Sequence, residues 1–117
     1  MTNTPNVHLR YLISELKKEA SVQQSALWKR VATDLEKPTR QRRVVNISRL
    51  NRSTKPKEIV IVPGKVLGSG ALDHEVTVAA WDFSASARKS ISEKGKALTI
   101  HDLLKLEPKG KNIRIIG

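Results

Sequence analysis

The 117-residue chain contains no cysteine. This absence excludes disulfide bonds and thiolate metal sites, including zinc ribbons and zinc knuckles. Long hydrophobic runs are missing too: the longest, Ile59–Val62, is far shorter than the roughly 20 residues that a membrane helix needs. The amino terminus has no cleavable hydrophobic stretch. We therefore expect a soluble, cytoplasmic protein that is not exported.

Aromatic residues are also scarce, since the chain has only Tyr11, Trp28, Trp81 and Phe83. Modules that read unstacked bases, such as the RRM sheet and the OB barrel, carry several aromatic side chains on exposed strands. The chain has too few to build such a platform. If it binds nucleic acid, we expect contacts to phosphate and sugar to dominate.

Acidic residues are absent between Lys37 and Lys57, where the chain carries eight basic residues. These are Lys37, Arg40, Arg42, Arg43, Arg49, Arg52, Lys55 and Lys57. An ordinary solvated face mixes both signs of charge, whereas a run of one sign repels itself until an external polyanion neutralises it. The formal net charge of +11 adds a long-range field of the same sign. This segment, called the basic segment below, predicts binding to nucleic acid.

The length is that of one domain. We predict a single α/β domain over residues 1–117 with three parts: a helical hairpin (1–36), the Arg-rich and extended basic segment (37–57), and a compact body of short strands and helices (58–117). Helical spacing in the hairpin predicts two helices, the second starting near Ser25 and stopping before Pro38. The apolar positions are Leu9, Leu12, Ile13, Leu16 and Ala20, then Leu27, Trp28, Val31 and Leu35.

After Pro38 the apolar period changes. Val45, Ile47 and Arg49 alternate with Asn46, Ser48 and Leu50 at a spacing of two, which predicts a short strand with one buried face over the second half of the basic segment. Ile59–Val62 predicts a strand buried on both faces and ended by Pro63 and Gly64, with a Gly-rich loop following.

The remaining chain alternates short strands and helices. Strands are expected at Val76–Trp81, Ala97–Ile100 and Asn112–Ile116. A helix that opens at Asp82, Ser84 or Ser86 is expected to close at Gly95, and a short one to span His101–Leu106.

Two other functions stay open. The stretch Pro63–Gly70 could cradle a mononucleotide through Lys65 and backbone N–H groups, but Val66 follows Lys65 where a P-loop requires serine or threonine. The hairpin could instead serve a DNA-binding regulator as a helix-turn-helix. Against this, Lys29 and Arg30 are the only cations in the core of its second helix, beside Asp34 and Glu36.

No residue pattern indicates catalysis. His74 lies beside Asp73 and Glu75, but neighbouring side chains on a strand point to opposite faces and cannot converge on one ion. We expect local hydrogen bonding there. No metal, cofactor or catalytic residue is predicted.

The stretch Lys37–Leu50 closely resembles the characteristic segment of the archaeal and eukaryotic large-subunit ribosomal protein 18e family, whose superfamily includes the bacterial large-subunit ribosomal protein 15. The similarity continues through Pro63–Gly70, Val78–Ala80 and Phe83–Ala87, and so spans nearly the whole chain. The length resembles that of archaeal members. The resemblance implies a structural protein of the large ribosomal subunit, with ribosomal RNA and neighbouring ribosomal proteins as partners and no enzymatic activity.

The resemblance also implies which side chains contact RNA. It points to Lys37, Arg40, Arg42, Arg43, Arg49 and Arg52 as the main contacts. Lys65, Gly68 and Gly70 in the Gly-rich stretch rank second. Lys55 and Lys57, together with Lys109 and Lys111 near the carboxyl terminus, complete the candidate set on the grounds of charge.

Overall fold

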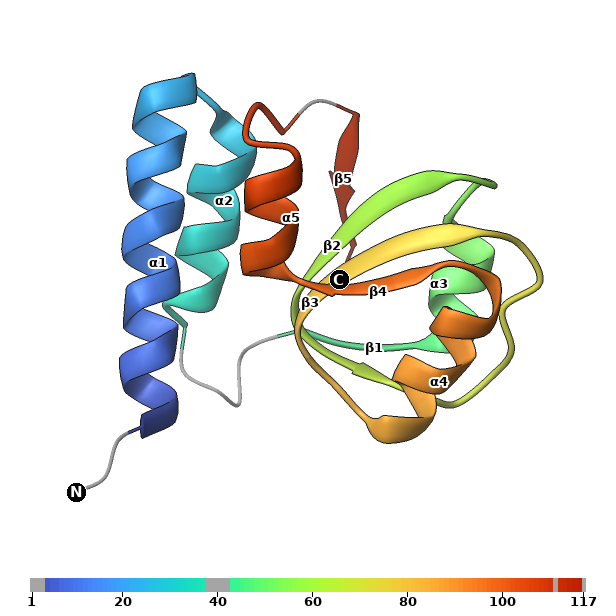
Figure 1. The fold of residues 1–117 in the computed structure, drawn as a ribbon. Helices are drawn as coiled ribbons and strands as arrows, with labels where there is room; N and C mark the ends of the chain where they lie inside the picture. Colours follow the sequence, from blue (N-terminus) through green and yellow to red (C-terminus); the bar gives the residue numbers. More distant parts are fainter. Residues whose placement is uncertain (1–3, 38–42, 111, 117) are drawn as a thin grey trace.

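A computed structural model describes residues 4–37, 43–110 and 112–116 of the chain (Figure 1). In the described residues, two helices are followed by a parallel sheet of five strands, with three further helices between the strands. The elements are α1 (Thr4–Gln23), α2 (Ala26–Leu35), β1 (Arg43–Asn46), α3 (Ile47–Ser53), β2 (Glu58–Leu67), β3 (Val76–Phe83), α4 (Ala85–Lys94), β4 (Lys96–Thr99), α5 (Ile100–Leu106) and β5 (Ile113–Ile115). The α/β class expected from the sequence is confirmed.

All strand pairings in the described sheet are parallel. The order runs β1-β2-β3-β4, and β5 pairs with the first half of β2 along the edge whose second half pairs with β1. Helices cover both faces, as parallel sheets require (Figure 1). The long central strand β2 therefore holds together segments from both halves of the chain.

The alternation of side chains along the strands divides the core in two. Val60 and Val62 of β2 pack on the face covered by α3 and α4. Ile61 points to the other face, against α1, α2 and α5. This confirms the expected strand at Ile59–Val62 with both faces buried, because successive side chains leave a strand on opposite sides.

The helical hairpin is confirmed, and it packs on the sheet through one apolar side of each helix. Leu12 and Leu16 of α1 and Val31 and Leu35 of α2 are buried in the same cluster. Trp28 is fully buried, and its indole Nε1 donates a hydrogen bond to the carbonyl oxygen of Pro108 at 2.6 Å. The hairpin is therefore anchored to the carboxyl-terminal part of the chain.

The strand expected over the second half of the basic segment is wrong beyond Asn46. The backbone is extended only as β1 and turns into helix α3 at Ile47. Ile47 and Leu50 are fully buried, and Thr54 is also buried. These positions follow spacings of three and four, which place them on one side of a helix. Val45 and Ile47 are two positions apart, which fits a strand, whereas Ile47 and Leu50 are three apart, which fits a helix. The alternation gave no sign that the backbone changes from one to the other between Asn46 and Ile47.

The expected end of the second strand at Pro63 and Gly64 is also wrong. β2 continues to Leu67, and its pairing with β3 shifts register between Val62 and Lys65. A proline has no N–H to donate, so it is tolerated in a sheet at such an irregularity. On the other edge, Gly64 is the register partner of Arg43 in β1. The loop that follows therefore begins only at Gly68.

The carboxyl-terminal elements agree with the sequence analysis to within two residues at their ends. Ser84 is the residue before α4, and its Oγ accepts a hydrogen bond from the backbone N–H of Ala87 at 3.2 Å. Ile100, expected to end a strand, begins α5 instead, because Thr99 caps that helix by accepting from the N–H of Asp102. Among the described residues, no helix is long and apolar enough to cross a membrane.

Candidate nucleic-acid interface

Helix α3 presents two arginines of the basic segment to solvent. Ile47 and Leu50 fix the inward side of the helix, so Arg49 and Arg52 lie on its exposed side. They are three positions apart, and side chains at this spacing are neighbours on a helix surface. The helix therefore offers two guanidinium groups on one face, each able to grip a phosphate with two hydrogen bonds.

Lys55 and Lys57 follow α3 in a turn that the protein holds at several points. The N–H of Lys55 donates to Oε1 of Glu58 at 2.9 Å, and the N–H of Lys57 donates to the carbonyl of Glu75 at 2.7 Å. Lys57 has a φ of +66°, a left-handed conformation that is costly for a lysine. Both side chains are exposed. The backbone bonds present the two ammonium groups outward beside the end of α3.

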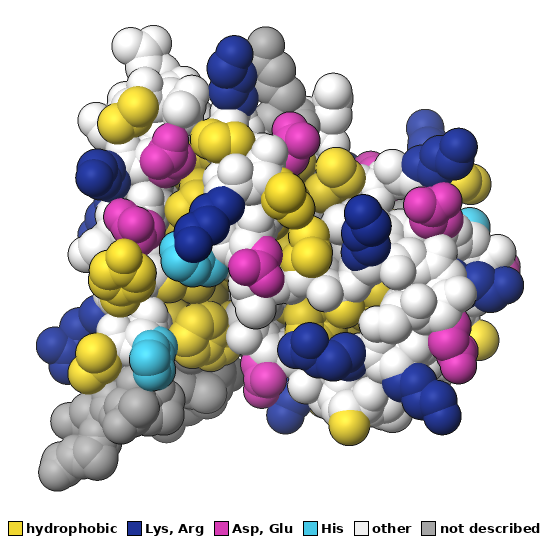
Figure 2. Space-filling model, in the orientation of Figure 1, with side chains coloured by type: hydrophobic (Ala, Val, Ile, Leu, Met, Phe, Trp, Pro, Cys, Tyr) yellow, Lys and Arg dark blue, Asp and Glu magenta, His cyan; other side chains and the backbone are white. Residues whose placement is uncertain are grey.

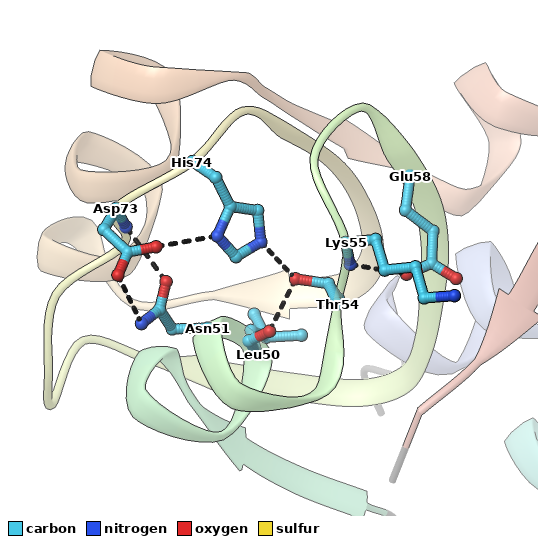
Figure 3. Close-up of polar contacts among 7 residues, drawn as sticks. All are labelled: Leu50, Asn51, Thr54, Lys55, Glu58, Asp73 and His74. Carbon is cyan, nitrogen blue, oxygen red and sulfur yellow. Dashed lines mark hydrogen bonds and ion pairs between the residues drawn. The ribbon is translucent and has the colours of Figure 1, made fainter.

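A polar network joins α3 to the loop between β2 and β3 (Figure 3). Thr54 Oγ1 donates to the carbonyl of Leu50 at 2.7 Å and lies 2.7 Å from Nε2 of His74. His74 Nδ1 is 2.8 Å from Oδ1 of Asp73, whose N–H donates to Oδ1 of Asn51 at 2.9 Å. The expected local hydrogen-bonding role of His74 is confirmed.

This network also changes the acidity of one carboxyl group. Hydrogen bonds from the side chains of His74 and then Asn51 hold the pKa of Asp73 below its ordinary value of 3.8. Asp73 therefore stays charged under mildly acidic conditions and keeps the loop bound to α3.

The glycines of the loop allow close packing against α3 and α4. Gly70 has a φ of +106°, and a Cβ there would lie 2.6 Å from the backbone nitrogen of Ser48. A Cβ on Gly68 would lie 2.1 Å from Oγ of Ser86. Both positions thus require glycine for packing. Lys65, on the exposed side of β2, has its Nζ 3.9 Å from Oδ2 of Asp82.

The other candidate residues are spread over the molecule. Lys37 follows α2, with its Nζ 3.4 Å from Oδ1 of Asp34. Lys109 is exposed in the turn after α5. Arg43 begins β1, but its side chain lies outside the described part of the structure, as do Arg40, Arg42 and Lys111 entirely. Arg49, Arg52, Lys55 and Lys57 thus lie on α3 and in the turn that follows it. Lys109 lies elsewhere, in the turn after α5.

The four grouped cations have no carboxylate partner within 4 Å among the described residues. The nearby Glu58 instead pairs with Arg114 at 3.0 Å. Arg114 also donates to the carbonyl of Ser53, so this arginine supports the end of α3. The charges of Arg49, Arg52, Lys55 and Lys57 therefore remain available to an external polyanion.

Comparison with known proteins shows what the chain is similar to. Residues 21–99 match a family model described as ribosomal proteins 50S-L15, 50S-L18e and 60S-L27A. The large ribosomal subunit protein eL18 of Methanothermobacter thermautotrophicus is 49% identical over 95% of this chain and 93% of its own length. The eL18 protein of Sulfurisphaera tokodaii is 46% identical over 98% of this chain and 95% of its own length, and that of Haloarcula marismortui is 43% identical over 95% and 96%.

The chain belongs to this family of ribosomal proteins. The resemblance seen in the sequence is thereby confirmed, and the similar proteins are archaeal eL18 proteins, as the length suggested. Because the eL18 family is one of structural ribosomal proteins, the expectation that the chain is not an enzyme is also confirmed. The structure also weakens the hypothesis that Pro63–Gly70 cradles a mononucleotide, because Gly64 lies within β2 and not in a loop.

Two exposed cations on α4, Arg88 and Lys89, are not among the candidates expected from the sequence. Helix α4 covers the same face of the sheet as α3. The guanidinium of Arg88 lies over the ring of Phe83, 5.3 Å from its centre. Lysine and arginine side chains are distributed over the visible surface of the body (Figure 2). The only signal in the sequence was a pair of adjacent cations, and without the fold nothing related it to α3.

Proposed function

We propose that the chain is a structural constituent of the large ribosomal subunit that binds and stabilises large-subunit ribosomal RNA through the basic segment. The observation that carries this proposal is the unpaired cluster of Arg49, Arg52, Lys55 and Lys57 on and beside α3. In a protein with a net charge of +11, cations that the chain itself leaves unneutralised favour a polyanionic partner.

The proposed mechanism is neutralisation of phosphates where RNA helices meet. Folded RNA brings negatively charged phosphates close together, and the repulsion between them limits how tightly RNA helices pack. A short helix held by buried Ile47 and Leu50 keeps the two arginines of α3 in place before RNA arrives. Less conformational entropy is then lost on binding. Contacts to phosphate and sugar position the protein, and shape carries most of the recognition.

In this proposal, the parts of the chain have different roles in RNA binding. The hairpin (1–36) and the body (58–117) hold the basic segment (37–57), whose remaining members are Lys37, Arg40, Arg42 and Arg43. Lys65, Lys109 and Lys111 add peripheral contacts, with neighbouring ribosomal proteins as further partners. Gly68 and Gly70 contribute by letting the loop lie close to α3 and α4.

The salt dependence of RNA binding tests the proposal. If six to eight phosphates are contacted, log affinity for large-subunit ribosomal RNA should fall with log salt with a slope of about −4 to −7. The double substitution Arg42→Ala with Arg43→Ala should weaken binding strongly and leave thermal unfolding of the free protein nearly unchanged. A flat salt dependence of the unmodified chain contradicts the proposal.

A further inference from the structure

The chain's two solvent-accessible aromatic side chains line one pocket. Trp28 and Phe83 are buried, whereas Tyr11 is 60% exposed and Trp81 is partly exposed. Tyr11 and Trp81 meet in a pocket of about 260 Å³, together with His8 and His101. Four of the chain's seven aromatic and histidine rings thus lie at one place, although they are up to 93 positions apart in the sequence.

Three segments build this pocket. His8 and Tyr11 lie three positions apart on one side of α1. Trp81 lies near the carboxyl end of β3, and Thr99 ends β4 opposite Ala80 of β3. The crevice outside the carboxyl ends of parallel strands is where open α/β sheets usually bind ligands. In Figure 2, histidine side chains border hydrophobic surface between α1 and the middle of the molecule.

The rings form a corner. The centres of the Tyr11 and His101 rings are 6.2 Å apart and their planes are 81° apart. A flat ligand stacked on one ring therefore directs its edge toward the other. The buried side chain of Ile100 contributes an apolar floor. This geometry suits a planar, aromatic ligand whose edge carries hydrogen-bonding atoms.

Polar atoms with spare hydrogen-bonding capacity surround the corner. In the described part of the chain, the ring nitrogens of His8 and His101 have no hydrogen-bond partner. Thr99 Oγ1 accepts from the N–H of Asp102 at 3.0 Å, which leaves its own hydroxyl hydrogen to donate. An apolar floor with a few convergent polar groups is the usual composition of a ligand pocket.

We propose that this pocket receives one unstacked base of the ribosomal RNA, an inference that rests on the proposed function. Its volume of about 260 Å³ is just below the range of about 300–1,000 Å³ of drug-sized sites, and so suits a single ring system. Exposed Lys105 lies four positions after His101 on α5, and so on the same side of that helix, where it can meet an adjoining phosphate. The protein would thus hold one base by stacking, in addition to its contacts with phosphate groups.

Removing the ring of Tyr11 tests this proposal. Tyr11→Ala in the full chain should weaken binding to protein-free large-subunit ribosomal RNA about 5- to 100-fold, the range expected for losing one base stacked on an aromatic ring. Tyr11→Phe keeps the ring and should bind within about twofold of the unmodified chain. Val22→Ala, a similarly exposed apolar position on α1 away from the pocket, is the matched control and should bind normally.

The histidines provide a second readout with an internal control. A single-stranded octamer of adenylate should shift the NMR signals of the His8 and His101 rings but not that of His74, which lies in the network beside α3. Unchanged His8 and His101 signals, or unchanged RNA affinity of Tyr11→Ala, overturn the proposal. Loss of assembly into the subunit with unchanged RNA affinity would assign the pocket to a protein neighbour and also overturn it. A flat salt dependence would instead remove the proposed function.

Discussion

The hairpin of α1 and α2 and the segment from Arg43 to Lys57 are both rich in lysine and arginine, but they use these residues differently. In the hairpin, Lys17 lies 2.8 Å from Glu36, and Arg30 lies 3.8 Å from the buried Asp34. Asp34 also lies 3.4 Å from Lys37, which directly follows the hairpin. In the later segment, Arg49 and Arg52 have no such partner among the described residues.

The difference teaches how charge pattern relates to role. Mixed signs within one element let the protein neutralise part of its own charge, so that the hairpin serves mainly as a packing unit. A segment of uniform sign cannot do this, and it is anchored by apolar side chains and by hydrogen bonds that involve none of its charged groups. Ile47, Leu50 and the bond from Thr54 to Leu50 supply those anchors here.

The largest effect is expected from breaking the hairpin's attachment. Trp28→Ala should lower the free energy of unfolding by about 3–5 kcal/mol, because it removes a fully buried ring and its bond to Pro108. Trp28→Phe should cost less, since most of the ring volume remains. Chemical denaturation measures both. RNA affinity of the folded fraction should stay normal, and a loss larger than that of Tyr11→Ala would show that the hairpin binds RNA beyond the pocket at Tyr11.

The next prediction concerns the arginines of α3 that have no carboxylate partner among the described residues. Arg49→Ala with Arg52→Ala should weaken RNA binding about 10- to 30-fold at physiological salt and reduce the salt slope by about 2. The free energy of unfolding should change by no more than about 0.5 kcal/mol for each exposed site.

Lys17→Ala with Arg30→Ala is the control for that experiment. It removes the same charge from cations that lie in ion pairs. Filter binding across a salt series should give an unchanged slope for this control. Equal slopes for the two double variants would mean that total charge, and not position, governs binding.

The packing role of the loop glycines gives a smaller effect. Gly70→Ala should destabilise the protein by more than about 1 kcal/mol, because an alanine resists a φ of +106° and its Cβ collides with the backbone of Ser48. Ser69→Ala, at the exposed neighbour, should melt like the unmodified chain. Thermal unfolding compares them. A loss of RNA affinity without any loss of stability would make Gly70 a direct contact instead.

The smallest effect concerns pH and the network beside α3. The pKa of Asp73 is lowered by its hydrogen bonds, so its contribution to stability is present above the ordinary value of 3.8 and is lost as pH falls through the lowered folded value. Asp73→Asn should therefore be slightly less stable at pH 7 and equally stable near pH 2. Thermal unfolding at both pH values tests this. A loss of stability in Asp73→Asn that is larger near pH 2 than at pH 7 would contradict the prediction.

Much of the architecture could be predicted from local patterns. The helices α1, α2 and α4 follow from apolar spacing and from capping residues such as Ser84. The doubly buried strand β2 follows from the run Ile59–Val62, since only a strand covered on both faces uses such a run. Where a strand passes directly into a helix, as between Asn46 and Ile47, the short alternation ran across the boundary and the strand prediction failed.

By itself, the sequence determined the electrostatic character of this protein: a stretch without acids cannot neutralise itself in any fold. It also determined the family, through motifs that span nearly the whole chain. Only the tertiary structure decided which cations share a surface and that Tyr11, Trp81 and two histidines line one pocket. The reason is that the fold brings residues of α1 to the ends of β3 and β4, and such a long-range arrangement leaves no periodic trace in the sequence.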